Sequence, residues 1–145
     1  MKYREATKND INAIFHVRTS VRENKLTLQQ LQELGITPKS INTMLKTTCK
    51  AWVAEHDHDI IGFSMANKKE GRVYALFILP EWENKGIGKN LLNYAESWLW
   101  QNGFEEIWLT TESGQTRAGG FYKYLGWRFK EKYYDDEDIL FKSKF

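Results

Sequence analysis

The turn Gly86-Ile87-Gly88 is the segment of the sequence whose residue types are best suited to binding a ligand. It stands between an apolar stretch, Arg72 to Leu79, and a helical pattern that closes at Gly103. The start of a helix presents about four unpaired backbone N–H groups and a partial positive charge, and glycines let an anion approach that backbone closely. The turn therefore predicts a phosphate site, and a tight turn without a ligand is the plain alternative.

Two common phosphate-binding patterns do not fit this turn. The dinucleotide-binding pattern needs a third glycine, where Leu91 stands, and it follows the first strand of its domain, whereas this turn lies past the midpoint of the chain. The nucleoside-triphosphate loop needs glycine at the position of Glu83 and serine or threonine at that of Asn90. The sequence therefore excludes both patterns and leaves another phosphate carrier.

Helical signals fill the first third of the chain. After a short strand from Lys2 to Thr7, Asp10 stands at the N-cap position of a helix that we expect to reach about Glu23. Thr27 with Gln30 fits a capping box, and Pro38 suits the first position of a further short helix. These signals predict one helix followed by two short helices over roughly residues 27–47.

The spacing of apolar residues changes to that of strands after Lys50. Arg72 to Leu79 is almost wholly apolar, which predicts a central strand covered on both faces. The remaining elements are predicted as strands Ala51 to Glu55, Ile60 to Ala66 and Glu105 to Thr111, helices Gly86 to Gly103 and Arg117 to Tyr124, and strands Trp127 to Tyr134 and Ile139 to Phe145. This order predicts an α/β fold, a mixed sheet with helices on both faces.

Composition narrows the class of protein. The chain has 145 residues with a net charge of +2 and no basic stripe, so we expect a single domain over residues 1–145 and no nucleic-acid partner. The longest apolar run, Val73 to Leu79, is far shorter than the roughly 18 residues of a membrane span, so we expect no membrane partner and a soluble, cytoplasmic protein.

Cys49, the one cysteine, cannot form an intramolecular disulfide. The cluster from Glu55 to Asp59 coincides with a predicted hairpin turn, so we expect no metal.

Two further motifs accompany the glycine turn. The segment from Glu83 to Gly88 resembles the acyl-CoA pyrophosphate loop of the Gcn5-related N-acetyltransferase (GNAT) superfamily, Gln/Arg-x-x-Gly-x-Gly/Ala, except at its first position. Leu76 to Pro80 is similar to the strand end that precedes this loop in the family. Gln115 to Trp127 resembles the C-terminal signature of the family, Asn-x-x-Ala-x-x-Phe-Tyr-x-x-x-Gly-aromatic. The resemblance covers nearly the whole chain.

The resemblance implies a mixed, mostly antiparallel sheet of six to seven strands whose central pair splays apart. It implies acetyl-CoA (CoA) as the cofactor, with its pyrophosphate on the backbone N–H groups of Gly86 to Asn90 and its pantetheine arm between the splayed strands. A backbone N–H near Phe77 to Ile78 would meet the thioester carbonyl. The cofactor-binding residues so implied are Phe77, Ile78, Leu79, Lys85, Gly86, Ile87, Gly88, Lys89, Asn90, Gln115, Arg117 and Tyr122.

Catalytic roles follow from the same resemblance. Tyr122 matches the tyrosine that donates a proton to the departing CoA thiolate. Tyr74 stands where many members carry a glutamate base, so the amine proton needs another route, and Glu23 and Glu112 are the candidates for accepting it. Each of these two carboxylates is equally compatible with a solvated loop. Glu83 replaces the usual Gln or Arg, and Gln115 replaces the usual Asn.

The function that these residues imply is an acetyl-CoA-dependent N-acetyltransferase that acts on a primary amine by direct attack in a ternary complex. A catalytically weak or inactive acyl-CoA-binding regulatory module is the alternative, and a protein-interaction domain is a third class. We expect a small or peptidyl cationic amine as acceptor, because carboxylates such as Glu23 would attract it. A homodimer, the identity of the acceptor and the use of longer acyl chains stay open.

Overall fold

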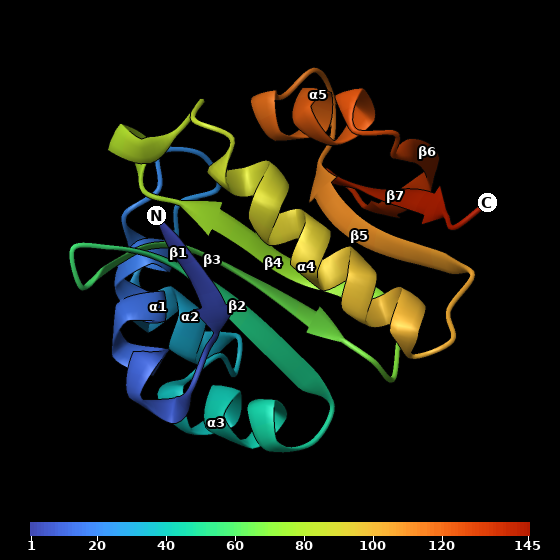
Figure 1. Cartoon of the computed structure of the whole chain (residues 1–145). Coiled ribbons are helices and arrows are strands. Elements are labelled where there is room, and N and C mark those ends of the chain that lie inside the picture. Colours follow the sequence, from blue (N-terminus) through green and yellow to red (C-terminus); the bar gives the residue numbers. More distant parts are fainter.

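The computed structural model describes all 145 residues. They form one seven-stranded sheet in the order β1-β2-β3-β4-β5-β7-β6, in which only β4 and β5 run parallel (Figure 1). The strands are β1 Lys2–Glu5, β2 Cys49–His56, β3 Asp59–Asn67, β4 Arg72–Ile78, β5 Glu106–Glu112, β6 Arg128–Tyr134 and β7 Glu137–Ser143. The helices are α1 Ile11–Thr19, α2 Leu28–Glu33, α3 Pro38–Lys46, α4 Ile87–Gln101 and α5 Arg117–Tyr124. The order of elements and the mixed, mostly antiparallel sheet are confirmed.

Helices cover both faces of the sheet, as the sequence predicts. Side chains alternate along a strand, so Ala51 and Val53 of β2 pack with α1 and α3, while Trp52 and Ala54 pack with α4. The long helix α4 crosses β2, β3 and β4 on its face, and α5 lies on the same side over the far half of the sheet (Figure 1). None of the helices combines the length and the apolar character that crossing a bilayer requires.

The helix starts follow the capping signals, with one exception. Thr27 forms the predicted capping box with Gln30, and Pro38 begins α3 behind the cap of Thr37. Asp10 is the N-cap residue of α1, as predicted, but its side chain makes no capping hydrogen bond there. Thr7 instead caps a 3₁₀ turn, Lys8–Asp10, that precedes α1. The carboxylate of Asp10 instead accepts a hydrogen bond from the Thr7 amide at 2.8 Å and pairs with Arg4 at 2.8 Å.

The first helix is shorter than predicted. It ends at Thr19 rather than near Glu23. The hydroxyl of Thr19 donates to the Phe15 carbonyl at 2.9 Å, and that of Ser20 to the His16 carbonyl at 2.6 Å. Such hydroxyls compete with the helical hydrogen bonds, so the chain leaves the helix here and residues 21–24 enter a loop.

The central strand pair β4/β5 is split. The two strands share only the pair Arg72 and Trp108, at the start of β4. On its other side, β4 carries a bulge against β3 at Tyr74, because Met65 pairs with Ala75 whereas Ala66 pairs with Val73. The predicted splay is therefore confirmed. Helices contact β4 on both faces, α4 on one and α1 on the other, as expected. Only Val73 of this strand is fully buried, however, because the other residues border the opening.

Candidate active site

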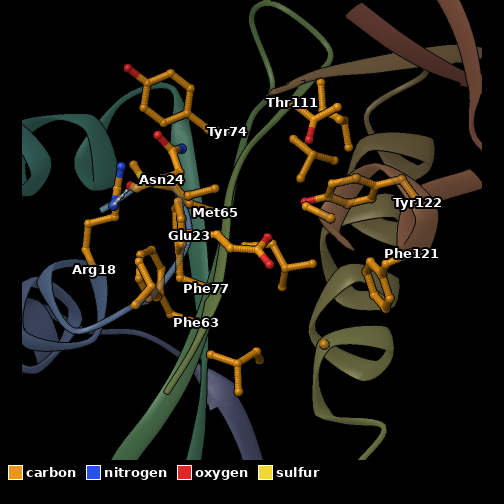
Figure 2. A pocket seen from close by; sticks show the side chains of 18 of the residues that line it. Arg18, Glu23, Asn24, Phe63, Met65, Tyr74, Phe77, Thr111, Phe121 and Tyr122 are labelled. Carbon is orange, nitrogen blue, oxygen red and sulfur yellow. Dashed lines mark hydrogen bonds between the residues drawn. The ribbon is translucent and has the colours of Figure 1, made fainter. Parts of the chain in front are cut away.

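A cavity of about 790 Å³ occupies the split between β4 and β5. Its wall continues from the loop after α1, past the bulge of β4, to the first turns of α4 and α5. Figure 2 shows Tyr122 and Phe121 on one side of this space and Arg18, Phe63 and Phe77 on the other. One cavity therefore joins the glycine turn to the loop that carries Glu23.

The glycine turn forms one end of the cavity. Gly86 has φ +82°, a left-handed conformation that side chains disfavour, and it serves as the N-cap of α4. The first helical hydrogen bond runs from the Asn90 amide to the Gly86 carbonyl, at 3.2 Å, so the amides of Ile87, Gly88 and Lys89 have no partner within the helix. A helix start with three such donors is suited to binding an anion.

Arg117 neutralises the negative charge of Glu83, the residue that departs from the family pattern in this turn. Its guanidinium donates to the Glu83 carboxylate and, at 3.1 Å, to the side-chain oxygen of Asn84. These contacts tie the start of α5 to the turn before α4. The carboxylate that replaces the usual Gln or Arg is therefore neutralised by an arginine from the second motif, and that arginine is engaged before any ligand arrives.

Replacing Glu83 by glutamine is expected to tighten acetyl-CoA binding by up to about tenfold, because it removes a negative charge and frees Arg117 for the pyrophosphate. The free energy of unfolding should change by less than about 1 kcal/mol, since the pair is partly exposed. Isothermal titration calorimetry and thermal denaturation measure the two effects. Weaker binding in Glu83→Gln would mean that the ion pair positions the turn rather than opposing the ligand.

The backbone of β4 offers one amide to the cavity beside this turn. The Leu79 amide donates to the Ile61 carbonyl of β3 at 2.9 Å. Because antiparallel strands exchange hydrogen bonds at every second residue, the Phe77 amide also faces β3 and the Ile78 amide faces the gap toward β5. Of the two residues expected near the thioester, Phe77 and Ile78, it is therefore Ile78 that presents its N–H to the cavity.

Tyr122 projects from α5 into the cavity toward Thr111 (Figure 2). Its ring packs against Phe121 and Trp127, with centroids 5.4 and 6.1 Å away, and the side chain is 9% exposed. Burial raises the pKa of Tyr122 above its ordinary value. The phenol therefore keeps its proton at neutral pH and has one available to donate.

A buried carboxylate, that of Glu96, holds the tryptophan that packs against Tyr122. Glu96 of α4 accepts a hydrogen bond from the Trp127 indole at 3.1 Å and one from Lys142 at 2.9 Å. The Trp127 amide donates to the Tyr122 carbonyl at 3.0 Å, so the tryptophan contacts the tyrosine through ring and backbone. Sequence reasoning missed Glu96, although its position four residues after Leu92 places it on the apolar face of the helix.

The candidate proton acceptors both reach the cavity. Glu23 comes from the loop after α1 and Glu112 from the end of β5. Figure 2 shows the Glu23 carboxylate in the space between the β4 side and Tyr122. Tyr74, at the bulge, borders the same end of the cavity.

The structure separates the expected site residues into two groups. The cavity is lined by Glu23, Phe77, Ile78, Gly86, Ile87, Gly88, Lys89, Glu112, Arg117 and Tyr122, and not by Leu79, Lys85, Asn90 or Gln115. Asn90 turns its side chain away from the cavity and donates to the Tyr3 hydroxyl at 3.0 Å. Lys85 and Gln115 are exposed.

Three arginines in the cavity wall, Arg18, Arg22 and Arg72, were not foreseen. Arg18 of α1 lies over the Phe77 ring at 4.2 Å, and Arg72 of β4 lies over the Trp108 ring at 4.6 Å. Arg18 follows Ile14 by four residues, which is the signal that it belongs to the buried face of its helix. The cavity wall, in which a carboxylate was expected at the acceptor end, therefore also contains arginines.

A split, bulged central strand pair with a glycine turn at the gap is the arrangement that the sequence resemblance implied. The family model described as the Acetyltransferase (GNAT) family matches residues 11–127 of this chain. The chain therefore belongs to the GNAT acetyltransferase family.

A curated relative of similar sequence is an uncharacterised N-acetyltransferase of Chlorobaculum tepidum, 28% identical over 104 residues. The match covers 70% of this chain and 64% of the relative, so this chain spans less than two thirds of that protein.

Solved structures share the fold at low sequence identity. The PaiA N-acetyltransferase of Thermoplasma acidophilum, in complex with coenzyme A, superimposes with a TM-score of 0.80 at 17% identity over 98% of both chains. A GNAT-family acetyltransferase of Staphylococcus aureus gives 0.78 at 17% identity, also over 98% of both chains. The ribosomal-protein-S18-alanine N-acetyltransferase of Escherichia coli gives 0.75 at 14% identity, over 98% of this chain and 92% of that one.

Proposed function

We propose that this protein is an acetyl-CoA-dependent N-acetyltransferase that transfers the acetyl group to a primary amine by direct attack in a ternary complex. The observation that carries the proposal is the single cavity through the β4/β5 split, which connects the glycine turn, Tyr122 and Glu23. Family membership and the CoA-bound structure of the same fold support it.

The donor half of the cavity fits acetyl-CoA. The unpartnered amides of Ile87, Gly88 and Lys89 would hold the pyrophosphate, and the gap in the sheet would accept the extended pantetheine arm along β4. Gly88 carries no side chain, so an anion can approach its backbone closely. Acetyl-CoA, when bound, supplies the acetyl group as a thioester.

The residues of the chain divide the reaction among them. The Ile78 amide would donate to the thioester oxygen as negative charge develops there. As the new C–N bond forms and the C–S bond breaks, Tyr122 would donate its proton to the departing sulfur. Glu23 or Glu112 would accept the proton of the amine through water, because Tyr74 offers no carboxylate at the usual base position.

Acetyl-CoA is expected to raise the melting temperature by more than about 5 °C. At 100 times its dissociation constant a ligand adds about 2.7 kcal/mol, and each kcal/mol shifts the midpoint of a chain of this size by about 2 to 4 °C. Differential scanning fluorimetry with acetyl-CoA, ATP and NADH measures this. A shift with ATP or NADH and none with millimolar acetyl-CoA would contradict the proposal.

Replacing Glu23 by glutamine is expected to lower kcat/KM by about 10 to 100-fold, because the amine then loses both a charge that attracts it and an acceptor for its proton. In the wild type the rate should rise with pH up to about 8 or 9, as more of the amine becomes neutral. Steady-state kinetics over this pH range are the measurement.

Glu105→Gln is the matched control for this experiment, because Glu105 is exposed and lies outside the cavity. Glu55 is less suitable, because its carboxylate pairs with Arg4 at 3.0 Å. If Glu23→Gln and Glu112→Gln both behave like the control, neither carboxylate serves the amine.

A further inference from the structure

Arg18 enters the acceptor end of the cavity without an anionic partner. Its guanidinium lies 4.2 Å from the Phe77 ring centroid, and its one hydrogen bond within the protein goes to the Asn24 carbonyl at 3.0 Å. No carboxylate lies within 4.0 Å of it. Figure 2 shows Arg18 between the loop of Asn24 and the aromatic side chains of the sheet. Burial lowers the pKa of Arg18, since the cation has lost water without gaining an anion.

Arg72 has the same lack of an anion on the same side of the sheet. Its guanidinium donates to the Thr110 hydroxyl at 3.1 Å and stacks between Tyr74 and Trp108, at 5.2 and 4.6 Å. Its Nε is buried without a hydrogen-bond partner. By contrast, Arg117 at the donor end of the cavity pairs with Glu83. Among the arginines of the cavity wall, Arg18, Arg72 and the exposed Arg22 therefore have no carboxylate partner, whereas Arg117 has one.

A partly desolvated guanidinium without an anion is costly unless a ligand supplies one. The planar fork of arginine matches a carboxylate, and stacking on an aromatic ring fixes the plane of that fork before the ligand binds. Phe77 provides this stacking for Arg18. The arrangement is therefore a preorganised site for an oxyanion.

The surroundings of Arg18 indicate what the rest of the ligand looks like. Glu23, five residues further along the chain, offers a negative charge to an ammonium group in the same cavity. Apart from Arg22 and Asn24, which flank Glu23, the wall that residues 21–36 contribute is apolar: it includes Val21, Leu26, Leu34 and Ile36, and Met65 of β3 adds to it. A cation site, an anion site and an apolar wall within one cavity match a zwitterion that carries an apolar side chain.

We propose that the acceptor is an amine that also carries a carboxylate, as a free amino acid with an apolar side chain does, and that Arg18 binds this carboxylate. The inference rests on the proposed N-acetyltransferase function. In the transfer, the amine nitrogen forms the bond to the acetyl carbon, the C–S bond breaks, and the carboxylate takes no part beyond orienting the molecule. Arg18 is then the residue that determines acceptor specificity.

The test compares matched amines by calorimetry on the full chain saturated with CoA, so that binding is measured without turnover. The pairs are leucine with 3-methylbutylamine and phenylalanine with phenethylamine, and the dipeptide Leu-Gly distinguishes a free amino acid from a peptide N-terminus. Each amino acid is expected to bind at least about tenfold more tightly than its decarboxylated partner and than the dipeptide. This comparison requires no variant, so it does not depend on how a substitution affects folding.

Arg18→Gln should reduce the preference for the amino acid to less than about threefold and leave acetyl-CoA affinity unchanged. Arg128→Gln is the matched control, because Arg128 also lies over an aromatic ring, that of Phe141 at 4.9 Å, but outside the cavity. The control should keep the full preference.

Equal binding of both members of each pair, or a preference that persists in Arg18→Gln, would overturn the inference. Tighter binding of the dipeptide than of leucine would overturn the assignment to a free amino acid. Thiol release from acetyl-CoA with the decarboxylated amines alone would overturn the inference and leave the N-acetyltransferase function standing. Preferential binding of amino acids without thiol release would support the carboxylate site and contradict the proposed function.

Discussion

Gly88→Asp is expected to abolish acetyl-CoA binding, with a loss of at least about 100-fold in affinity, while the domain stays folded. The substitution places a side chain and a negative charge among the free amides at the start of α4, where the pyrophosphate would lie. The Cβ position is 3.4 Å from the Phe121 ring, an ordinary contact, so the effect should come from the carboxylate rather than from a clash. Calorimetry with acetyl-CoA and circular dichroism are the measurements.

Two variants serve as controls for Gly88→Asp. Gly88→Ala adds the methyl group without the charge and should retain most of the affinity. Gly103→Ala should lower stability, because Gly103 has φ +94°, and should leave affinity unchanged. Retained binding by Gly88→Asp would place the cofactor elsewhere on the molecule.

Tyr122→Phe is expected to lower kcat by about 10 to 10³-fold with little change in acetyl-CoA affinity, because it removes a proton donor and keeps the ring. The packing of this ring against Phe121 and Trp127 should be preserved. Since burial raises the pKa of Tyr122, the wild-type acid stays protonated through pH 9 and should not limit the alkaline side of the rate profile. Steady-state kinetics at saturating acetyl-CoA measure the effect on kcat.

Tyr124→Phe is the natural comparison, because Tyr124 lies two residues away on the same helix and is 87% exposed. It should have wild-type kcat. Equal kcat for wild type and Tyr122→Phe would show that water or another group protonates the thiolate.

The elements were predictable because their signals are local. Capping boxes at Thr27 and Thr37, the proline at the start of α3 and the glycine turn at Gly86 each depend on residues within a few positions of one another. The hydrophobic spacing of α4 and α5 is equally local. These signals are sufficient for the order of elements, and with it the position of the turn.

The features that the sequence did not reveal depend on contacts between distant segments. Asp10 stands at the predicted N-cap position, but Arg4 and the Thr7 amide bind its carboxylate. Lys85, Lys89 and Arg117 were the cations expected to offset Glu83, and the sequence could not show that Arg117, 34 positions away, is the one that pairs with it. The types of neighbouring residues in the sequence do not show which carboxylate or cation forms an ion pair in the folded protein.

The acceptor end of the cavity is a second place where contacts between distant segments decide the chemistry. Glu23 was recognisable as a carboxylate in a loop, and this favoured a cationic acceptor. The position of Arg18 above Phe77 became evident only when α1 was placed against β4. The family resemblance implied a bulge in the central strand, but its place at Tyr74 depends on the register of β3 against β4, which local spacing does not encode.

The most direct test of the proposed function measures CoA release and N-acetylated product together, by thiol titration and mass spectrometry, across amines that include amino acids, polyamines, aminoglycosides and peptides. The cavity predicts that, with one of these amines, CoA is released and the acetylated amine is formed in equal amounts. Both products should be lost in Tyr122→Phe and Gly88→Asp. Tight acetyl-CoA binding with no acetylated product from any amine would contradict the proposed function, and would instead favour a regulatory acyl-CoA-binding module.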